Sequence, residues 1–517
     1  MVKTFKDILR LACIMMLPGI IPATKKMIDR QEIRRMKKLL SILLTISLML
    51  SAAGVFAEAP QGTPPGEPPE GFNGGTPPGD PPGEPPEGFG SGNPPGDPPG
   101  GGFGGGTPPG GGTSSFEYAA ATEITKPTES DGQVYSSDTA DESALMINAA
   151  DTVNLTDITV TKTGDSNGGD NCNFYGLNAA VLVMGGSTTA ITGGKVETSA
   201  SGANGVFCYG GNGGRNGADG DGTTLYISGT TITTTGDGSG GIMTTGGGVT
   251  YAENLTVTTS GRSSAAIRTD RGGGTVTVNG GTYTSNGLGS PAIYSTAAIT
   301  VRDATLVSNL SEGVCIEGMN SITLENCDLT ANNTQRNGHA TFLDSIMIYQ
   351  SMSGDADSGT SAFTMTGGSL TSLSGHMFHV TNTHAVITLN SVTLKNEGSD
   401  ILLSVCDDGW NGASNIAELN ADAQSLTGTI LVGENSTLKL SLANGSAFEG
   451  NISGEITNAE GTQVSTETGT VSVSLDETST WILTADTYIT EFSGNAVDVI
   501  GNGYTLYVNG TALEGIR

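Results

Sequence analysis

A six-residue pattern that returns at regular spacing limits the fold of this chain more than any other feature. The pattern reads apolar, polar, turn residue, any residue, polar, apolar. Successive starts lie 36, 36, 25, 26, 23, 23, 41 and 24 residues apart, at Leu155, Ile191, Ile227, Ala252, Val278, Val301, Leu324, Met365 and Leu389. Self-similarity at a nearly fixed period is typical of a repeat protein whose structural units stack on one another.

The third position of the pattern holds residues that tolerate a left-handed backbone. Gly, Asn and Asp adopt positive φ at lower cost than bulkier residues. Ser391 takes this position in the last repeat. We therefore expect a structural column of turns, each over the turn of the preceding repeat, at Asp157, Gly193, Gly229, Asn254, Gly280, Asp303, Asn326 and Gly367.

Each pattern supplies two short strands joined at a bend, and a third strand follows a polar turn, as at 266–268, 292–294 and 314–316. One coil of this kind cannot bury its apolar row, whereas stacked coils hydrogen-bond each backbone and align Ile, Val and Leu inside. Right-handed crossovers are preferred between parallel strands. The predicted fold class is therefore all-β, a single-stranded right-handed parallel β-helix (solenoid). A β-sandwich would share the composition, but its turns would not preserve this spacing.

The longer intervals fit one coil plus an insertion, near residues 165–176, 210–222 and 333–359. Threonines at 233–235 and at 256, 258 and 259 do not continue in register along the sequence, so no ice- or mineral-binding face is predicted. We assign residues 117–414 to the β-helix and residues 415–517 to terminal β coils and a cap that protects the open end.

The N-terminal residues 1–57 do not follow the repeat pattern and have the residue order of an export signal. Arg34, Arg35, Lys37 and Lys38 precede an apolar run at 39–50 and small residues that end at Ala57. This order describes a secretory signal peptide, because the apolar run is shorter than the about 20 residues of a membrane span. We predict a signal region at 1–57 with cleavage after Ala57, and Met36 is an alternative translation start. The expected location is secreted and extracellular, or associated with the cell surface, with no transmembrane segment after processing.

Residues 58–116 separate the signal from the repeats. Of the 21 Pro residues, 17 fall between 59 and 113, in runs such as PPGDPPGEPPEGF. Proline pairs favour extended polyproline II, and the intervening Gly prevents a packed core. We therefore expect a disordered Pro/Gly-rich spacer before the β-helix.

The charge balance excludes one class of partner. With 52 Asp+Glu against 22 Lys+Arg the formal net charge is −30, and phosphate binding needs clustered basic residues, so no nucleic acid is expected. An acidic surface also repels anionic polysaccharides. Five Cys remain after Ala57 with no CxxC or Cys/His metal spacing, which favours buried small residues over a metal site.

The segments ITGGKVETS, LYISGTTITTT and VTVNGGTYTSNG resemble the pectin-lyase-like superfamily of right-handed β-helices, in particular adhesin-like secreted proteins of clostridia. Residues 481–486 and 502–507 are similar to the terminal coils of those bacterial proteins. The resemblance covers roughly residues 140–517. It implies a monomeric protein of the cell surface or medium that binds glycans, or host or microbial surface proteins, without catalysis.

A polysaccharide lyase or glycoside hydrolase is the alternative function, because some β-helix proteins are enzymes and others only bind ligands. A structural component of the cell surface is the third possible function. Polygalacturonase-like enzymes carry Gly-His-Gly and Arg-x-Lys motifs. This chain has Asp407 and Asp408 but lacks both motifs. We therefore assign no catalytic residue and lean away from an enzyme.

Two kinds of turn are candidate sites. Asp-x-Asp sequences resemble the start of a calcium loop, so calcium is a candidate cofactor at Asp219, Asp221, Asp355 and Asp357, with solvated acidic turns as the alternative. Trp410, flanked by Asp407, Asp408 and Asn411, is a candidate for stacking on a sugar ring, or for packing beneath its loop.

All four histidines fall between residues 339 and 384. His339 and His376 each follow a Gly at the predicted start of a third strand, so we expect them about 5 Å apart on neighbouring coils. They are a candidate ligand pair or a polar ladder at a strand edge. His376 and His379 differ by an odd number and should point to opposite faces of their strand.

Overall fold

The structure is a computed structural model that describes residues 117–212, 219–410 and 414–517. These belong to a compact unit spanning Gly96–Arg517. The predicted signal region, the spacer and Asn411 lie outside the described residues.

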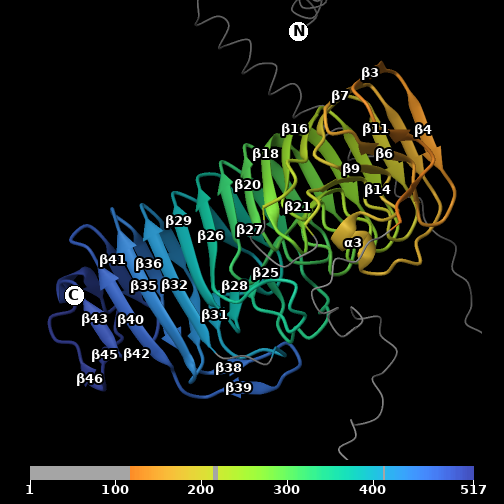
Figure 1. The fold of residues 1–517 in the computed structure, drawn as a ribbon. Coiled ribbons are helices and arrows are strands. Elements are labelled where there is room, and N and C mark those ends of the chain that lie inside the picture. Colours follow the sequence, from red (N-terminus) through yellow and green to blue (C-terminus); the bar gives the residue numbers. More distant parts are fainter. Residues whose placement is uncertain (1–116, 213–218, 411–413) are drawn as a thin grey trace, which may run out of the picture. The chain divides into compact units, whose positions relative to one another are not determined.

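The described residues form a parallel β-helix, which confirms the predicted all-β solenoid (Figure 1). Each coil contributes one strand to each of three ladders. The first and second ladders share a 22-stranded sheet and the third is a 13-stranded sheet. The ladders exist because parallel strands about 4.8 Å apart pair every backbone group with the coils before and after.

The strands of the first ladder are β3 (Thr128–Asp131), β7 (Thr152–Thr156), β10 (Thr188–Thr192), β13 (Thr224–Ser228), β16 (Gly248–Thr259), β18 (Gly274–Ser285), β20 (Ala298–Arg302), β23 (Ser321–Glu325), β26 (Thr360–Thr366), β29 (His384–Asn390), β32 (Asn415–Asp422), β35 (Ser436–Ala443), β40 (Thr470–Leu475) and β43 (Glu491–Ser493). The second ladder shares β16 and β18 and adds β4 (Val134–Ser137), β8 (Thr159–Lys162), β11 (Lys195–Thr198), β14 (Thr231–Thr234), β21 (Thr305–Ser308), β24 (Asp328–Ala331), β27 (Ser369–Ser372) and β30 (Thr393–Asn396). In the last coils a four-stranded sheet follows the bend, formed by β33 (Ser425–Thr427), β36 (Ala447–Gly450), β41 (Thr480–Leu483) and β44 (Val499–Ile500).

The third ladder contains β2 (Glu123–Ile124), β6 (Leu145–Asn148), β9 (Val181–Met184), β12 (Val206–Tyr209), β15 (Ile242–Thr245), β17 (Ile267–Thr269), β19 (Ile293–Ser295), β22 (Val314–Glu317), β25 (Asp344–Tyr349), β28 (His376–Thr381), β31 (Ile401–Val405), β34 (Thr429–Val432) and β37 (Ile452–Ser453). The smaller sheets are β1 (Ala119–Ala120) with β5 (Glu142–Ser143), the hairpin β38 (Ile456–Thr457) with β39 (Gln463–Ser465), and β42 (Thr487–Ile489) with β45 (Leu506–Val508) and β46 (Thr511–Ala512). Two short helices are present in the described residues, α3 (Asn171–Tyr175) and the 3-10 helix η1 (Ala496–Asp498).

The bends between the first and second ladders form a column. All eight residues of the structural column have positive φ, between 48° at Asp157 and 69° at Gly193 and Gly280, and Ser391 follows at 56°. Strand registers align the pattern starts, for example Leu155 with Ile191 and Ile191 with Ile227. Backbone N–H groups then bond from one bend toward the next coil, as from Asp157 to the Thr192 carbonyl at 2.8 Å.

The fourth position of the pattern, to which the sequence assigned no preference, faces the core. Ile158, Leu255, Cys327 and Val392 occupy it and all are buried in the main apolar cluster. The bend interrupts the strand alternation, so a side chain at the corner turns inward. Together with the stacked Ile, Val and Leu of the strands, each worth about 1.5–3 kcal/mol when buried, these residues fill the interior.

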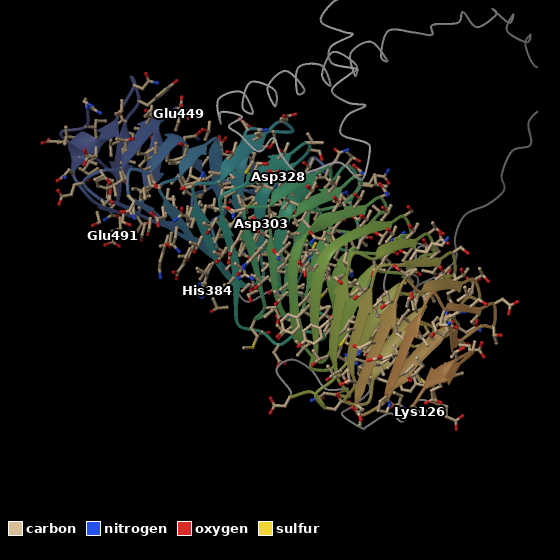
Figure 2. The ribbon with its side chains drawn as sticks, turned by 90° about the horizontal axis from the view of Figure 1, so that it is seen from above. Lys126, Asp303, Asp328, His384, Glu449 and Glu491 are labelled. Atoms are coloured by element: carbon tan, nitrogen blue, oxygen red, sulfur yellow. The ribbon has the colours of Figure 1, made fainter. Side chains whose placement is uncertain are left out.

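The five cysteines of the described residues are free and buried, as expected: Cys172, Cys208, Cys315, Cys327 and Cys406. The outer surface carries acidic side chains such as Asp303, Asp328, Glu449 and Glu491 (Figure 2). No helix within the described ranges has the length and apolar character needed to cross a membrane.

The threonine register inferred from the sequence was wrong. Thr231, Thr256 and Thr282 pair in order on the outer face of the second ladder, and Thr233, Thr258 and Thr284 do the same. The unequal lengths of the insertions conceal this alignment in the sequence. Thr305 extends the first row, which lies between Lys195 and Asp328, so that row spans four consecutive coils. The second row lies between Glu197 and Val307 and spans three.

Candidate functional site

Insertions cover the outer face of the third ladder. One contains α3, and others connect β24 to β25, β25 to β26 and β31 to β32. Their apolar side chains pack against outward-facing ladder residues in three clusters. In register order the outward residues are Phe207, Met243, Arg268, Tyr294, Cys315, Met347, His379 and Ser404. Because several of these are polar or ionisable, this covered face is a candidate site.

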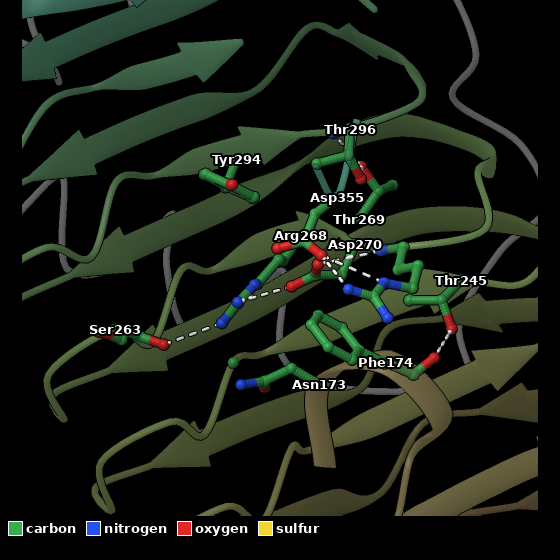
Figure 3. Close-up of polar contacts among 12 residues, drawn as sticks. Asn173, Phe174, Thr245, Ser263, Arg268, Thr269, Asp270, Tyr294, Thr296 and Asp355 are labelled. Atoms are coloured by element: carbon green, nitrogen blue, oxygen red, sulfur yellow. Dashed lines mark hydrogen bonds and ion pairs between the residues drawn. The ribbon is translucent and has the colours of Figure 1, made fainter. Parts of the chain in front are cut away.

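A charged cluster lies on this face, and Figure 3 shows the part of it around Arg268, Asp270 and Asp355. Its members are Arg268, Asp270, Arg271, Glu317 and Asp355. Arg268 Nη2 donates to Asp270 Oδ2 at 2.7 Å, and both side chains are at most 6% exposed. Arg271 Nε donates to Asp355 Oδ1 at 3.1 Å across 84 residues of sequence. The Arg271 guanidinium also lies 4.3 Å from the ring centre of Phe174 in α3, so Arg271 joins two insertions.

Glu317 lies at the end of β22 and is surrounded by hydroxyl groups. Tyr294 and Tyr349 donate to Glu317 Oε2, the latter at 3.3 Å. Ser351 and Ser353 donate to Oε1, the latter at 3.2 Å. Four donors compensate for the burial of this carboxyl group, and two of them hold the 350–359 insertion against the ladder.

Two carboxyl groups of the charged cluster have raised pKa values. Burial raises the pKa of Asp270 to about 6, although the charge of Arg268 opposes the shift. Burial also raises the pKa of Glu317, while the bonds from Ser351 and Tyr294 work against it. Perturbed carboxyl groups often mark functional sites. Here, however, each arginine is already paired with a carboxylate of the cluster, and the pair Arg271–Asp355 connects the 350–359 insertion to the third ladder.

The histidines do not form the predicted pair on neighbouring coils. The register of the third ladder places His376 opposite Asp344. His339 lies in the preceding insertion, where its ring centre is 5.4 Å from that of Trp410. The prediction was wrong because the insertion between β24 and β25 displaces His339 from the strand.

Nor do His376 and His379 point to opposite faces. The Nδ1 atoms of both rings lie 2.8 Å from Ser404 Oγ. Met377 and Phe378 between them are both buried in the core, so the alternation of the strand is interrupted at this point. The neighbouring β31 carries a register shift between Ile401 and Leu403.

Ser404, His379 and Asp408 form a buried polar chain. His379 Nε2 lies 3.3 Å from Asp408 Oδ2, and both side chains have no exposed area. Burial favours a raised pKa at Asp408, but bonds from His379 and Thr341 outweigh it and the pKa is lowered. Hydroxyl, imidazole and carboxylate stand in the order used for nucleophilic catalysis. Ser404 is also fully buried, so no substrate can reach its hydroxyl, and the contacts of these three residues join β28, β31 and Asp408.

His376 is expected to contribute to acid sensitivity. Burial lowers its pKa from 6.5 to about 3, with the charge of His379 adding to the shift. The unfolded chain therefore binds a proton below about pH 6.5 that the folded chain does not, and stability falls as the pH decreases from there. Between pH 7 and pH 5 the expected loss is about 2 kcal/mol. His376→Gln should remove this part of the pH dependence, measured by urea unfolding at pH 7 and pH 5. His384→Gln is the matched control, and equal pH dependence in both variants would contradict the prediction.

The other residues predicted to bind a ligand are engaged within the fold. Trp410 is partly buried, with its ring centre 5.0 Å from that of Tyr349. Asp407 Oδ1 accepts a bond from Asn415 Nδ2 at 2.7 Å. Asp408 takes part in the polar chain described above. The structure therefore brings Trp410 and His339 together, whereas His376 belongs to the neighbouring group around Ser404.

The four aspartates predicted to bind calcium are divided between separate turns. Asp221 Oδ1 accepts bonds from the Thr223 backbone and hydroxyl at 2.9 and 2.6 Å. Asp219 is exposed, Asp355 accepts a bond from Arg271, and the Asp357 carbonyl accepts a bond from the Met319 backbone N–H. Within the ranges that the structure describes, no three His, Cys, Asp or Glu side chains stand close enough to hold a metal ion.

An open aromatic pair lies on the outer face of the first ladder. Tyr226 and Tyr251 are register partners, 47% and 43% exposed, with ring centres 5.1 Å apart and planes 12° apart. They were not predicted from the sequence, although each directly precedes the first residue of the pattern in its coil. Nor was Glu317 predicted, because the pattern gives no signal for it and an insertion distant in sequence supplies its serine partners.

The chain matches no protein-family model, no curated protein and no solved structure.

Proposed function

We propose that this chain is an exported, adhesin-like β-helix protein of the pectin-lyase-like type that binds glycans without turning them over. The open pair Tyr226–Tyr251 is the observation that carries the proposal. Large exposed aromatic rings on a polar sheet face are costly to leave in water, and their apolar faces suit the C–H faces of sugar rings. The surrounding threonines offer hydroxyl partners for a sugar.

The charged cluster supports binding over catalysis. A general acid or base must come within hydrogen-bond reach of its substrate. Asp270 and Glu317 are at most 3% exposed, and their partners are supplied by the chain itself. A substrate would have to displace the 350–359 insertion to reach them.

A polysaccharide lyase or hydrolase is the second candidate, favoured by one observation. Asp270 and Glu317 have raised pKa values beside two arginines, as in sites that transfer protons near neutral pH. This function requires the insertion to open.

A glycan array with the full mature chain, run beside assays for reducing sugar and unsaturated product, tests the proposal. We expect binding without turnover. Tyr226→Ala and Tyr251→Ala should each weaken binding about tenfold or more, since truncation of an aromatic anchor costs about 1–2 kcal/mol or more. Tyr504→Ala, at a tyrosine that is 42% exposed in a turn near the C-terminus, is the control and should bind as the wild type. Turnover of any polysaccharide would favour the enzyme instead.

A further inference from the structure

One row of side chains on the outer face of the first ladder contains a gap. The registers place Glu129, Asn154, Ala190, Tyr226 and Tyr251 side by side on five consecutive coils. Ala190 carries a single methyl group between the larger Asn154 and Tyr226. The row therefore has a recess one coil wide, with Ala190 as its floor; we call it the Ala190 slot.

The tyrosine pair shows which way the wall of this slot faces. Tyr226 and Tyr251 lie on adjacent coils and their rings are stacked and nearly parallel. The flat faces of both rings are therefore turned toward the neighbouring coils along the axis of the β-helix. Tyr251 covers one face of Tyr226. The other face is turned toward the coil of Ala190, which consequently has an aromatic wall on one side.

The opposite wall is polar. Asn154 makes no side-chain hydrogen bond to another described residue, so its carboxamide has donors and acceptors to offer a ligand. Thr188 and Thr192 flank Ala190 on β10 and are both exposed. A shallow depression lined by Pro127, Thr128, Glu129, Thr152 and Asn154 adjoins the slot at Asn154.

The dimensions fit one sugar ring. Strands two coils apart are separated by roughly 9.6 Å. A pyranose in van der Waals contact with Tyr226 lies about 4 Å from that ring, which leaves space for hydrogen bonds between its hydroxyls and Asn154. The single charged residue of the row is Glu129, and it disfavours an anionic sugar.

We propose that the Ala190 slot binds one neutral hexopyranose residue of a glycan. The sugar stacks on the free face of Tyr226 and hydrogen-bonds to Asn154, Thr188 and Thr192. This inference rests on the proposed glycan-binding function and names its site and its preference for neutral over uronic-acid sugars.

The test is a titration of the full mature chain with immobilised cellohexaose, mannohexaose, chitohexaose and hexagalacturonate. We expect at least one neutral glycan to bind and hexagalacturonate to bind weakly. Ala190→Leu fills the slot and should weaken binding at least about tenfold. Ala298→Leu makes the same change on the same face, away from the tyrosines, and should leave binding unchanged. Asn154→Ala should weaken binding about fivefold without filling the slot, and Glu129→Gln should improve binding of hexagalacturonate.

The outcomes separate the slot from the broader function. If the wild type binds neutral glycans and both Ala190→Leu and Asn154→Ala bind equally well, the slot is overturned while glycan binding stands. If no glycan binds, both proposals fail. If a peptide with the chain's own sequence PPGDPPGEPPEGF binds and Ala190→Leu abolishes this, the slot receives proline, and the sugar assignment is overturned.

Discussion

Replacing Gly368 by valine is expected to destabilise the fold by about 3–6 kcal/mol. Gly368 follows the bend at Gly367 with φ +68°, a conformation that a β-branched residue adopts only under strain. A Cβ atom there would stand 2.0 Å from the Cys327 carbonyl oxygen of the preceding coil and 2.7 Å from its nitrogen. Both contacts are with backbone, so no side-chain rotation relieves them. Guanidinium unfolding followed by circular dichroism measures the loss.

The matched control is Gly229→Asn, at the third position of another bend. The φ of Gly229, +62°, is equally left-handed, but the nearest atom to an added Cβ would be 4.0 Å away. Two other bends have asparagine at the third position, Asn254 and Asn326, both with positive φ. We expect a change of less than about 1 kcal/mol. If both variants unfold at the wild-type midpoint, the close approach of the two backbones at the bend does not restrict which residues these positions accept.

Arg271→Met is expected to cost about 3–5 kcal/mol, because it leaves the Asp355 carboxylate without its partner in a largely buried place. The side chains of Arg271 and Asp355 are 11% and 18% exposed. The substitution also removes the cation–π contact to Phe174. Denaturation measures the global loss, and hydrogen exchange should report faster opening of α3 and residues 350–359.

Arg302→Met is the control for the loss of an arginine in an ion pair. Arg302 Nε lies 2.8 Å from Glu325 Oε2, but the two side chains are 42% and 40% exposed, so solvent screens the pair and the expected loss is much smaller than that of Arg271→Met. Adding Asp355→Asn to Arg271→Met should recover part of the stability, since the unpaired charge is gone. Equal losses in Arg271→Met and Arg302→Met would show that the charged cluster is not what holds the insertions.

The candidate sites were less predictable than the fold, and the histidines show why. The odd spacing of His376 and His379 implied opposite faces, yet both reach Ser404 because Met377 and Phe378 both enter the core. Whether a strand keeps its alternation depends on the packing of the neighbouring coil. Similarly, Arg271 and Asp355 are 84 residues apart, and nothing in their local sequence indicates that they pair.

Local chemistry, repeated in phase along the chain, was enough to specify the coil. Positive φ is cheap at Gly, Asn and Asp, and apolar residues on either side of each bend must be buried, so stacked bends and strands follow. Only the tertiary structure decides which side chains cover the third ladder and which aromatic rings remain exposed to solvent. Those outcomes depend on how insertions of unequal length fold back across several coils, and the side chains that then meet are distant in sequence.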